Sequence, residues 1–266
     1  MKIFISADIE GVAGVTVPEE TNPDHKDFPK FARRMSLEVA AACEGAVAAG
    51  ATDILVKDAH WHARNIDDAL LPKETRLHRG WSGHPQAMMD GIDETFDATM
   101  FVGYHAMAGS GGNPLAHTKS GGLVQKMTIN DVPTSEFRLS AFTAAMHRVP
   151  TAFLSGDQAL CDEVAGYCDG IETYATMEGR GTSTTSVQPE VAVDRIRKGT
   201  EKALSGDLSK LLVDNPSRFK LAIEYKKAAL AYRRGFYPGA FVENENTVCF
   251  ETDDWFEALR FVVFVI

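Results

Sequence analysis

The chain has 266 residues, of which 44% are hydrophobic and 24% are charged, as in an ordinary globular protein. This length suits one large α/β domain or one domain with a smaller lobe. The formal net charge is −10 at pH 7, whereas a nucleic-acid-binding protein needs a basic face to replace the counterions of phosphate, so we expect no nucleic-acid partner. No apolar run approaches the roughly 20 residues that span a bilayer, so we expect no membrane partner either.

The first residues and the cysteines favour a cytoplasmic location. The apolar run at residues 2–7 is shorter than the core of a signal peptide, and Asp8 and Glu10 end it. No cysteine belongs to a CxxC pair, and Cys43 lies in an Ala-rich helical pattern typical of a small buried residue. The four cysteines are Cys43, Cys161, Cys168 and Cys249. A reducing compartment suits such a chain.

The first part of the chain alternates strands and helices. Residues 2–7 are rich in Ile and Phe and predict a strand. Residues 31–49 place apolar side chains at helical spacing before Gly50, and residues 53–57 predict a short buried strand. A strand, a helix and a strand in this order form a βαβ unit, whose strands are parallel. Further predicted elements are strands at 98–102, 123–129 and 151–154, a turn at 130–133 and a helix at 136–146.

The second part of the chain has its own set of elements. Residues 179–186 are rich in Gly, Ser and Thr and indicate a domain boundary or an active-site loop. Beyond them we predict helices at 190–204, at 226–234 and from Asp254, and strands at 219–224 and 247–251. The sequence therefore predicts a three-layer α/β/α domain with a mostly parallel sheet in residues 1–185. A smaller α+β lobe would occupy residues 186–266.

Potential metal ligands follow three of the predicted strands. Asp8 and Glu10 come after the first strand, His60 after the second and His105 after the third. Ligands bind beyond the carboxyl ends of parallel strands, so these side chains are expected to converge there. Carboxylates and neutral imidazoles suit zinc, and less selectively Mn²⁺ or Co²⁺. Asp8 could bridge two ions, in which case Glu136, at the start of a helix, is the best candidate for a fifth ligand.

Each of these residues also has an ordinary structural interpretation. A single Asp after a strand is more often a turn or helix-capping residue, and we expect Asp157 to cap the helix that begins at Gln158. A single His is usually a surface or core residue, and we assign no role to five of them: His25, His62, His78, His84 and His147. The joint placement at three strand ends is what favours a metal site for the residues named above.

His117 lies twelve residues beyond His105, after the flexible segment 108–114. Such a loop could fold His117 over a metal site without making it a ligand, and it could then act as a general base, a general acid or an oxyanion donor. The Gly-rich run does not end in a Lys-Ser/Thr pair, so a phosphate-binding P-loop is not expected. The segment 79–89 either lines the substrate pocket or forms a surface loop around a buried Trp.

Several short motifs carry a resemblance to a known family. They lie at residues 6–11, 58–60, 103–106, 116–118 and 129–133, followed by Glu136. Their order and residue types resemble those of the D-aminopeptidases over about the first 160 residues. The chain departs from the family at Ser135, where a Gly is usual, and at Phe137 and Arg138, which replace a smaller and less charged pair.

The resemblance implies two zinc ions per subunit, with Asp8 bridging them. Glu10 and His60 would complete one ion, and His105 and Glu136 the other. The catalytic residue of the family falls on His117. The family also implies a ring-shaped homo-oligomer, a decamer of stacked pentamers.

These expectations define one function and two alternatives. The main hypothesis is a zinc-dependent aminopeptidase that removes the N-terminal residue of short peptides, of the D-Ala type, with a metal-activated water. A non-catalytic, uptake-associated dipeptide-binding protein is the first alternative, but it would need a secretion signal. The second is a metal-dependent amidase or phosphatase with a non-peptide substrate.

Overall fold

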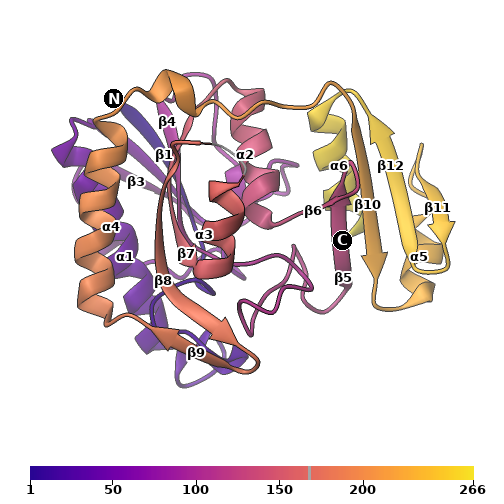
Figure 1. Cartoon of the computed structure of the whole chain (residues 1–266), viewed down its shortest axis with the longest axis horizontal. Helices are drawn as coiled ribbons and strands as arrows, with labels where there is room; N and C mark the ends of the chain where they lie inside the picture. Colours follow the sequence, from indigo (N-terminus) through magenta and orange to yellow (C-terminus); the bar gives the residue numbers. More distant parts are fainter. Residues whose placement is uncertain (167–168) are drawn as a thin grey trace.

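The computed structural model of the chain describes residues 1–166 and 169–266. The prediction that Cys168 is unpaired therefore concerns a residue outside the described ones. Two sheets organise the chain, a seven-stranded sheet and a five-stranded sheet that stand side by side (Figure 1). No helix in the described ranges is both long enough and apolar enough to cross a membrane.

The larger sheet has the order β3-β2-β1-β4-β7-β8-β9. All its neighbouring strands are parallel except β8 and β9, which form an antiparallel hairpin. The strands are β1 (Lys2–Ala7), β2 (Asp53–Asp58), β3 (Thr75–His78), β4 (Ala98–Tyr104), β7 (Thr151–Asp157), β8 (Glu172–Arg180) and β9 (Ser183–Ser186).

Helices cover both faces of this sheet and produce the predicted three layers. One face carries α1 (Phe28–Ala48) and α4 (Pro189–Leu204), which pack on each other, and the other carries α2 (Glu136–Met146) and α3 (Gln158–Ala165) (Figure 1). Alternate side chains of β1 therefore enter different cores: Ile3 and Ile5 pack with the α1 side, and Phe4 packs with the α2 side. All three are fully buried, as expected for a strand covered on both faces.

The smaller sheet is antiparallel and has the order β11-β12-β10-β5-β6. Its strands are β5 (Val124–Ile129), β6 (Val132–Pro133), β10 (Phe219–Tyr225), β11 (Phe241–Asn244) and β12 (Thr247–Thr252). Two helices belong to this α+β lobe, α5 (Ala228–Arg234) and α6 (Trp255–Val265). Short 3-10 turns complete the elements: η1 (Pro18–Glu20), η2 (Asp68–Leu70), η3 (Ala87–Met89) and η4 (Leu208–Leu211).

The two sheets do not divide the chain at a single point. Strands β5 and β6 lie before residue 186 but belong to the smaller sheet, where β5 pairs with β10 and β6 pairs with β5. Helix α4 lies after that residue but packs on α1. The division into residues 1–185 and 186–266 stays a prediction about folding units. The smaller sheet itself is built from residues on both sides of that boundary.

Segment 179–186 is the main element that the sequence described differently. It contains the end of β8, the turn and all of β9, with Gly179 opposite Thr184 and Arg180 opposite Ser183, and so forms the tip of a hairpin instead of a loop. Its Gly, Ser and Thr side chains are small enough for either structure, so composition alone did not separate them. The turn predicted at 130–133 is tighter than expected, because Asn130 and Asp131 make it and Val132 already pairs with Ile129.

Close contacts between backbones shape the carboxyl end of the larger sheet. The chain leaves β1 for β2 and β3 on one side and returns to β4 on the other, so the switch point of the topology lies between β1 and β4. There the backbone N–H of Gly11 donates to the carbonyl of Gly103 at 2.8 Å. A Cβ on Gly11 would meet the Tyr104 carbonyl oxygen at 1.8 Å, and a Cβ on Gly103 would meet the Asp8 carbonyl oxygen at 2.2 Å. Glycine is therefore required for the two loops to approach each other.

We predict that Gly11→Ala lowers the free energy of unfolding by about 1–3 kcal/mol or more, because the added methyl must displace backbone atoms. Gly111→Ala is the matched control, since neither glycine has a positive φ and a Cβ on Gly111 meets nothing within 4 Å. Denaturant unfolding of both variants measures the difference. Equal midpoints would show that the close approach at Gly11 is not a constraint.

Candidate metal centre

The structure brings all the predicted ligands to the carboxyl end of the larger sheet. Asp8 and Glu10 follow β1, His60 follows β2, His105 follows β4, and Glu136 is the first residue of α2. All five are at most 5% exposed. Charged side chains are rarely so buried unless they are paired with opposite charges or bind metals, so the cluster requires an explanation.

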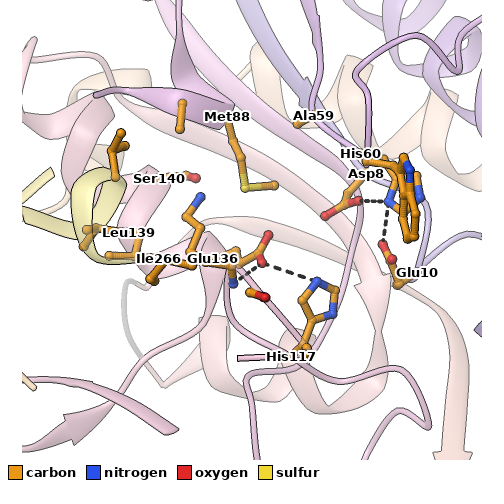
Figure 2. A pocket seen from close by; sticks show the side chains of 18 of the residues that line it. Asp8, Glu10, Ala59, His60, Met88, His117, Glu136, Leu139, Ser140 and Ile266 are labelled. Carbon is orange, nitrogen blue, oxygen red and sulfur yellow. Dashed lines mark hydrogen bonds and ion pairs between the residues drawn. The ribbon is translucent and has the colours of Figure 1, made fainter. Parts of the chain in front are cut away.

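Asp8, Glu10 and His60 form the first of two groups (Figure 2). The Nδ1 atom of His60 lies 3.2 Å from Oδ1 of Asp8 and 3.2 Å from Oε2 of Glu10. One potential ligand atom from each residue lies within 4.8 Å of the others. A single ion placed between them could therefore contact all three.

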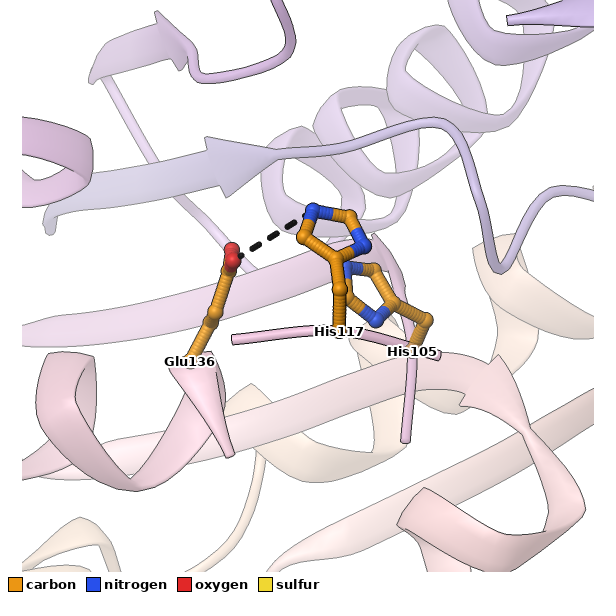
Figure 3. A group of neighbouring side chains, drawn as sticks. All are labelled: His105, His117 and Glu136. Atoms are coloured by element: carbon orange, nitrogen blue, oxygen red, sulfur yellow. Dashed lines mark ion pairs between the residues drawn. The ribbon is translucent and has the colours of Figure 1, made fainter. Parts of the chain in front are cut away.

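His105, His117 and Glu136 form the second group under the same distance limit (Figure 3). The imidazole rings of His105 and His117 are stacked, with centroids 4.3 Å apart. The Nε2 atom of His117 lies 3.6 Å from Oε1 of Glu136. The sequence analysis predicted that His117 could lie over the metal site without binding the metal. In the structure His117 is close enough to Glu136 to be either a ligand or a neighbour of the ligands.

Asp8 connects the two groups through its two oxygens. Its Oδ1 atom faces His60, and its Oδ2 atom lies 3.7 Å from Nε2 of His105. A carboxylate in this position can give one oxygen to each of two ions. The geometry is therefore compatible with the bridging role expected for Asp8.

Backbone carbonyls hold all three histidines in one orientation. Nε2 of His60 lies 2.8 Å from the Thr21 carbonyl, Nδ1 of His105 lies 3.0 Å from the Ala106 carbonyl, and Nδ1 of His117 lies 2.9 Å from the Leu115 carbonyl. A carbonyl only accepts, so each of these nitrogens carries a hydrogen and donates it. The other nitrogen of each ring faces the carboxylates and is left to accept a proton or bind a cation. Metal-binding histidines are typically held in this way.

A second set of polar side chains fixes the loops that carry the cluster. Asp58 accepts from the backbone N–H of Asn65 at 2.5 Å, and the Asn65 amide donates to the carbonyl of His60 at 2.7 Å. Asp157 caps α3 at the N–H of Leu160, as predicted, and it also accepts from the N–H of Ala106 at 2.7 Å. The residues next to His60 and His105 are therefore tied down independently of the cluster.

Glu38 of α1 supports the loop after β1, and the sequence analysis did not find it. Its Oε1 atom accepts from the backbone N–H of Ala13 at 2.9 Å, and the side chain is 1% exposed. Burial raises the pKa of Glu38 to about 8, against the lowering effect of the Ala13 hydrogen bond and of Arg34. No periodic or motif signal distinguishes this glutamate from other helical glutamates.

The charges within the cluster shift the acid–base behaviour of its members. Burial and the neighbouring Glu10 raise the pKa of Asp8 to about 7. Burial alone would lower the pKa of His60, but Glu10 and Asp8 hold it well above its usual value. Burial likewise opposes the rise for His105, whose pKa is raised to about 9 by Glu136, Glu10 and Asp8. The clustered carboxylates thus favour a positive charge between them.

A metal ion fits this donor set. Nε2 of His105 is buried and has no hydrogen-bond partner among the described residues, and Oε2 of Glu10 has the 3.2 Å ion-pair contact with His60 but no hydrogen bond. Both residues belong to the cluster, and both atoms would be available to hold a metal ion. Imidazole nitrogens and carboxylate oxygens are the usual ligands of catalytic zinc. A cation would replace the protons that the raised pKa values of His60 and His105 imply.

A pocket of about 900 Å³ opens onto the cluster. Segment 79–89 contributes Trp81, Gln86 and Met88 to its wall, so this segment lines the pocket. The ring of Trp81 is 43% exposed and therefore is not the buried Trp of a surface loop. Lys119, two residues after His117, also lines the pocket and had no role in the sequence analysis.

The histidines without an assigned role lie outside both groups. Within residues 1–166 and 169–266, neither group includes any of them: His25, His62, His78, His84 and His147. Ser135, one of the departures from the family pattern, accepts from the N–H of Arg138 at 3.2 Å and so caps the helix that begins with Glu136. The substitution therefore keeps the start of α2 in place.

The family model described as D-aminopeptidase matches residues 1–264. The chain belongs to the D-aminopeptidase family. It is accordingly a metallo-aminopeptidase, which decides against the non-catalytic alternative. A curated D-aminopeptidase of Bacillus subtilis (strain 168) is 29% identical over 264 residues, covering 98% of this chain and 94% of that protein.

A solved structure has the same fold throughout. It is described as the Zn-dependent D-aminopeptidase DppA from Bacillus subtilis, a self-compartmentalizing protease. The TM-score is 0.93 at 27% sequence identity, and the match covers 100% of this chain and 96% of that one. The expected fold class is therefore confirmed, including the smaller α+β lobe.

Proposed function

We propose that this chain removes the N-terminal residue of short peptides, of the D-Ala type, with two zinc ions per subunit. The observation that carries the proposal is the shared orientation of the three histidines. Each donates one ring N–H to a backbone carbonyl and turns its other nitrogen toward a carboxylate of the cluster. The zinc dependence of the matching solved structure supports the choice of metal.

In this proposal each group of side chains holds one ion. Glu10 and His60 would hold the first, His105 and Glu136 the second, and Asp8 would give one oxygen to each. When bound, zinc lowers the pKa of a coordinated water toward ~7 and polarises the scissile carbonyl. The protein keeps these ligands in place through the backbone carbonyls and through Asp157, so they need little rearrangement during the reaction.

We assign proton transfer to His117. Its side chain is 23% exposed and lines the pocket, whereas the side chain of His105 is completely buried behind it. Its Nε2 atom faces Glu136, and its Nδ1–H is held by the carbonyl of Leu115. A histidine so placed can accept the proton of the attacking water and deliver it to the leaving amine. Ligation by His117 is the alternative that its distance to Glu136 leaves open.

We also propose a cytoplasmic location. Among the described residues, Cys43, Cys161 and Cys249 are all unpaired and buried, as expected in a reducing compartment. Fractionation of cells that produce the chain tests this location. Recovery outside the cytoplasm would contradict it.

We further propose a homo-oligomeric ring, a decamer as the family resemblance implies. Seven large apolar side chains are exposed on the smaller lobe: Val132, Tyr232, Phe236, Phe241, Val242, Val263 and Phe264. Their exposed fractions reach 73% at Phe236, and such a surface is typical of a protein–protein contact. A second copy of the chain is the partner that we infer, because the matching solved structure is described as self-compartmentalizing.

Light scattering should therefore give a mass several times that of one 29.0 kDa chain. Phe236→Glu is expected to lower the mass by placing a charge in the contact. Val191→Glu is the control, because Val191 is an exposed apolar residue (47%) of α4, which packs on α1 beside the larger sheet. A monomeric wild-type chain would contradict the oligomer.

The aminopeptidase proposal predicts complete dependence on metal. Removal of metal with a chelator should abolish the release of D-alanine from D-Ala-D-Ala, and Zn²⁺ should restore it. L-Ala-L-Ala, assayed in parallel, should be hydrolysed more slowly. Full activity after exhaustive chelation would exclude the mechanism, and faster hydrolysis of the L-dipeptide would exclude the proposed substrate class.

His117→Ala should lower kcat by roughly 10²–10⁴-fold, the usual contribution of a general acid–base residue. The zinc content should stay at the wild-type value, because the assigned ligands remain. His25→Ala, which removes an imidazole from outside both groups, is the matched control. Loss of one zinc ion in His117→Ala would show instead that His117 is a ligand.

A further inference from the structure

Lys119 occupies an unusual position beside the metal centre. Its backbone has a φ of 65°, a left-handed conformation that is uncommon for residues other than glycine. Its backbone N–H donates to Oε1 of Glu136 at 2.6 Å. The backbone of Lys119 is therefore fixed by its hydrogen bond to Glu136, and its side chain lines the pocket.

The ammonium group of Lys119 has no hydrogen-bond or ion-pair partner within residues 1–166 and 169–266. The two other lysines near the pocket wall differ in this respect. Nζ of Lys226 donates to the Gly121 carbonyl at 2.6 Å, and Nζ of Lys57 donates to the Gly80 carbonyl and lies 4.4 Å from the Trp81 ring centroid. An unpartnered cation that is partly buried is costly unless a ligand pairs with it.

The two ends of the pocket differ in polarity. Asp8, Glu10 and His60 lie at one end, while Leu139, Ser140 and Ile266 lie at the other, with Glu136 between them (Figure 2). The pocket-lining residues of α2 and α6, together with Ile266 directly after α6, are mainly apolar: Leu139, Leu259, Val262, Val263 and Ile266. A peptide whose scissile bond lies at the metal ligands would extend its next residue toward this end.

Lys119 belongs to the middle of the pocket, because its backbone N–H donates to Glu136, which lies between the two ends. Burial lowers its pKa, and the charges of Glu136 and Asp8 act in the opposite direction, so the ammonium lies within electrostatic reach of both carboxylates. It forms no ion pair with either of them, so it remains available to a ligand. One residue of an extended peptide spans about 3.6 Å. The carboxylate of a dipeptide therefore lies within one residue of the scissile bond, near the metal ligands.

We propose that Lys119 binds the C-terminal carboxylate of a dipeptide substrate and so makes the enzyme selective for dipeptides with a free C-terminus. The inference rests on the proposed aminopeptidase function and adds a determinant of the substrate. An ammonium is a compact donor that pairs well with a carboxylate. The apolar wall formed by α2 and α6 would contact the side chain of the same substrate residue.

The test compares D-Ala-D-Ala with its C-terminal amide, D-Ala-D-alaninamide. The wild-type zinc-loaded enzyme should prefer the free acid, and Lys119→Met should raise KM for the acid by roughly 10- to 100-fold, the range for hydrogen bonds to charged groups. For the amide, kcat/KM should change by less than about twofold, because no carboxylate is present. Activity on the amide also shows that the variant is folded.

Two further variants make the comparison specific. Lys119→Arg keeps the positive charge and should retain part of the preference for the acid. Lys226→Met removes a charge from the same pocket wall, but that ammonium already donates to the carbonyl of Gly121. The ratio of kcat/KM for the acid to kcat/KM for the amide should therefore stay at the wild-type value. Loss of the ratio in Lys226→Met, with its retention in Lys119→Met, would overturn the proposal.

The other outcomes also decide the question. Equal wild-type activity on acid and amide overturns the role of Lys119 and leaves the aminopeptidase function standing. An equal fall of kcat for both substrates in Lys119→Met shows that the lysine acts at the reacting carbonyl, which also overturns the proposal. If the wild type hydrolyses neither compound, the proposed function fails, and calorimetry then compares binding of the two compounds. Stronger binding of the acid that is lost in Lys119→Met supports the role of Lys119, and equal binding contradicts it.

Discussion

Three carboxylates crowded into one buried space are the feature on which the rest of the site depends. Asp8, Glu10 and Glu136 are each at most 5% exposed, and such a concentration of negative charge is unfavourable without a compensating cation. Burial raises the pKa of Asp8 to about 7, and repulsion from Glu10 acts in the same direction. Protons on His60 and His105 can relieve it, and divalent cations relieve it more completely because each brings two charges. The three buried carboxylates therefore favour the binding of a cation between them.

The fold makes this crowding possible by bringing backbones unusually close together. Parallel pairing of β1 with β2 and β4 aligns three carboxyl ends, and the glycines at 11 and 103 let the following loops touch. The histidines then turn toward the carboxylates because backbone carbonyls hold their other nitrogens, from a distant loop for His60 and from the same loop for His105 and His117. Each element contributes only one or two groups, so the site exists only in the folded chain. The smaller lobe closes the far side of the pocket through α6.

The sequence predicted the layered fold and the clustering of ligands because both depend on local signals. Strand periodicity, the positions of Asp8, His60 and His105 after strands, and the start of α2 at Glu136 can all be read along the chain. Pairing between distant segments could not be read in this way. The joining of β5 to β10, and the hairpin at 179–186, depend on which partner a strand finds in space. The roles of the Thr21 carbonyl, Glu38 and Lys119 are likewise three-dimensional, because no spacing rule relates them to the cluster.

The central claim, that two ions lie on either side of Asp8, is tested most directly by anomalous X-ray scattering at the zinc edge from crystals of the zinc-loaded protein. The account predicts two peaks about 3.5–4 Å apart, the separation usual for paired catalytic metals. One peak should lie between Glu10 and His60, the other between His105 and Glu136, with one oxygen of Asp8 directed at each. A single peak, or two peaks that Asp8 does not join, would contradict it.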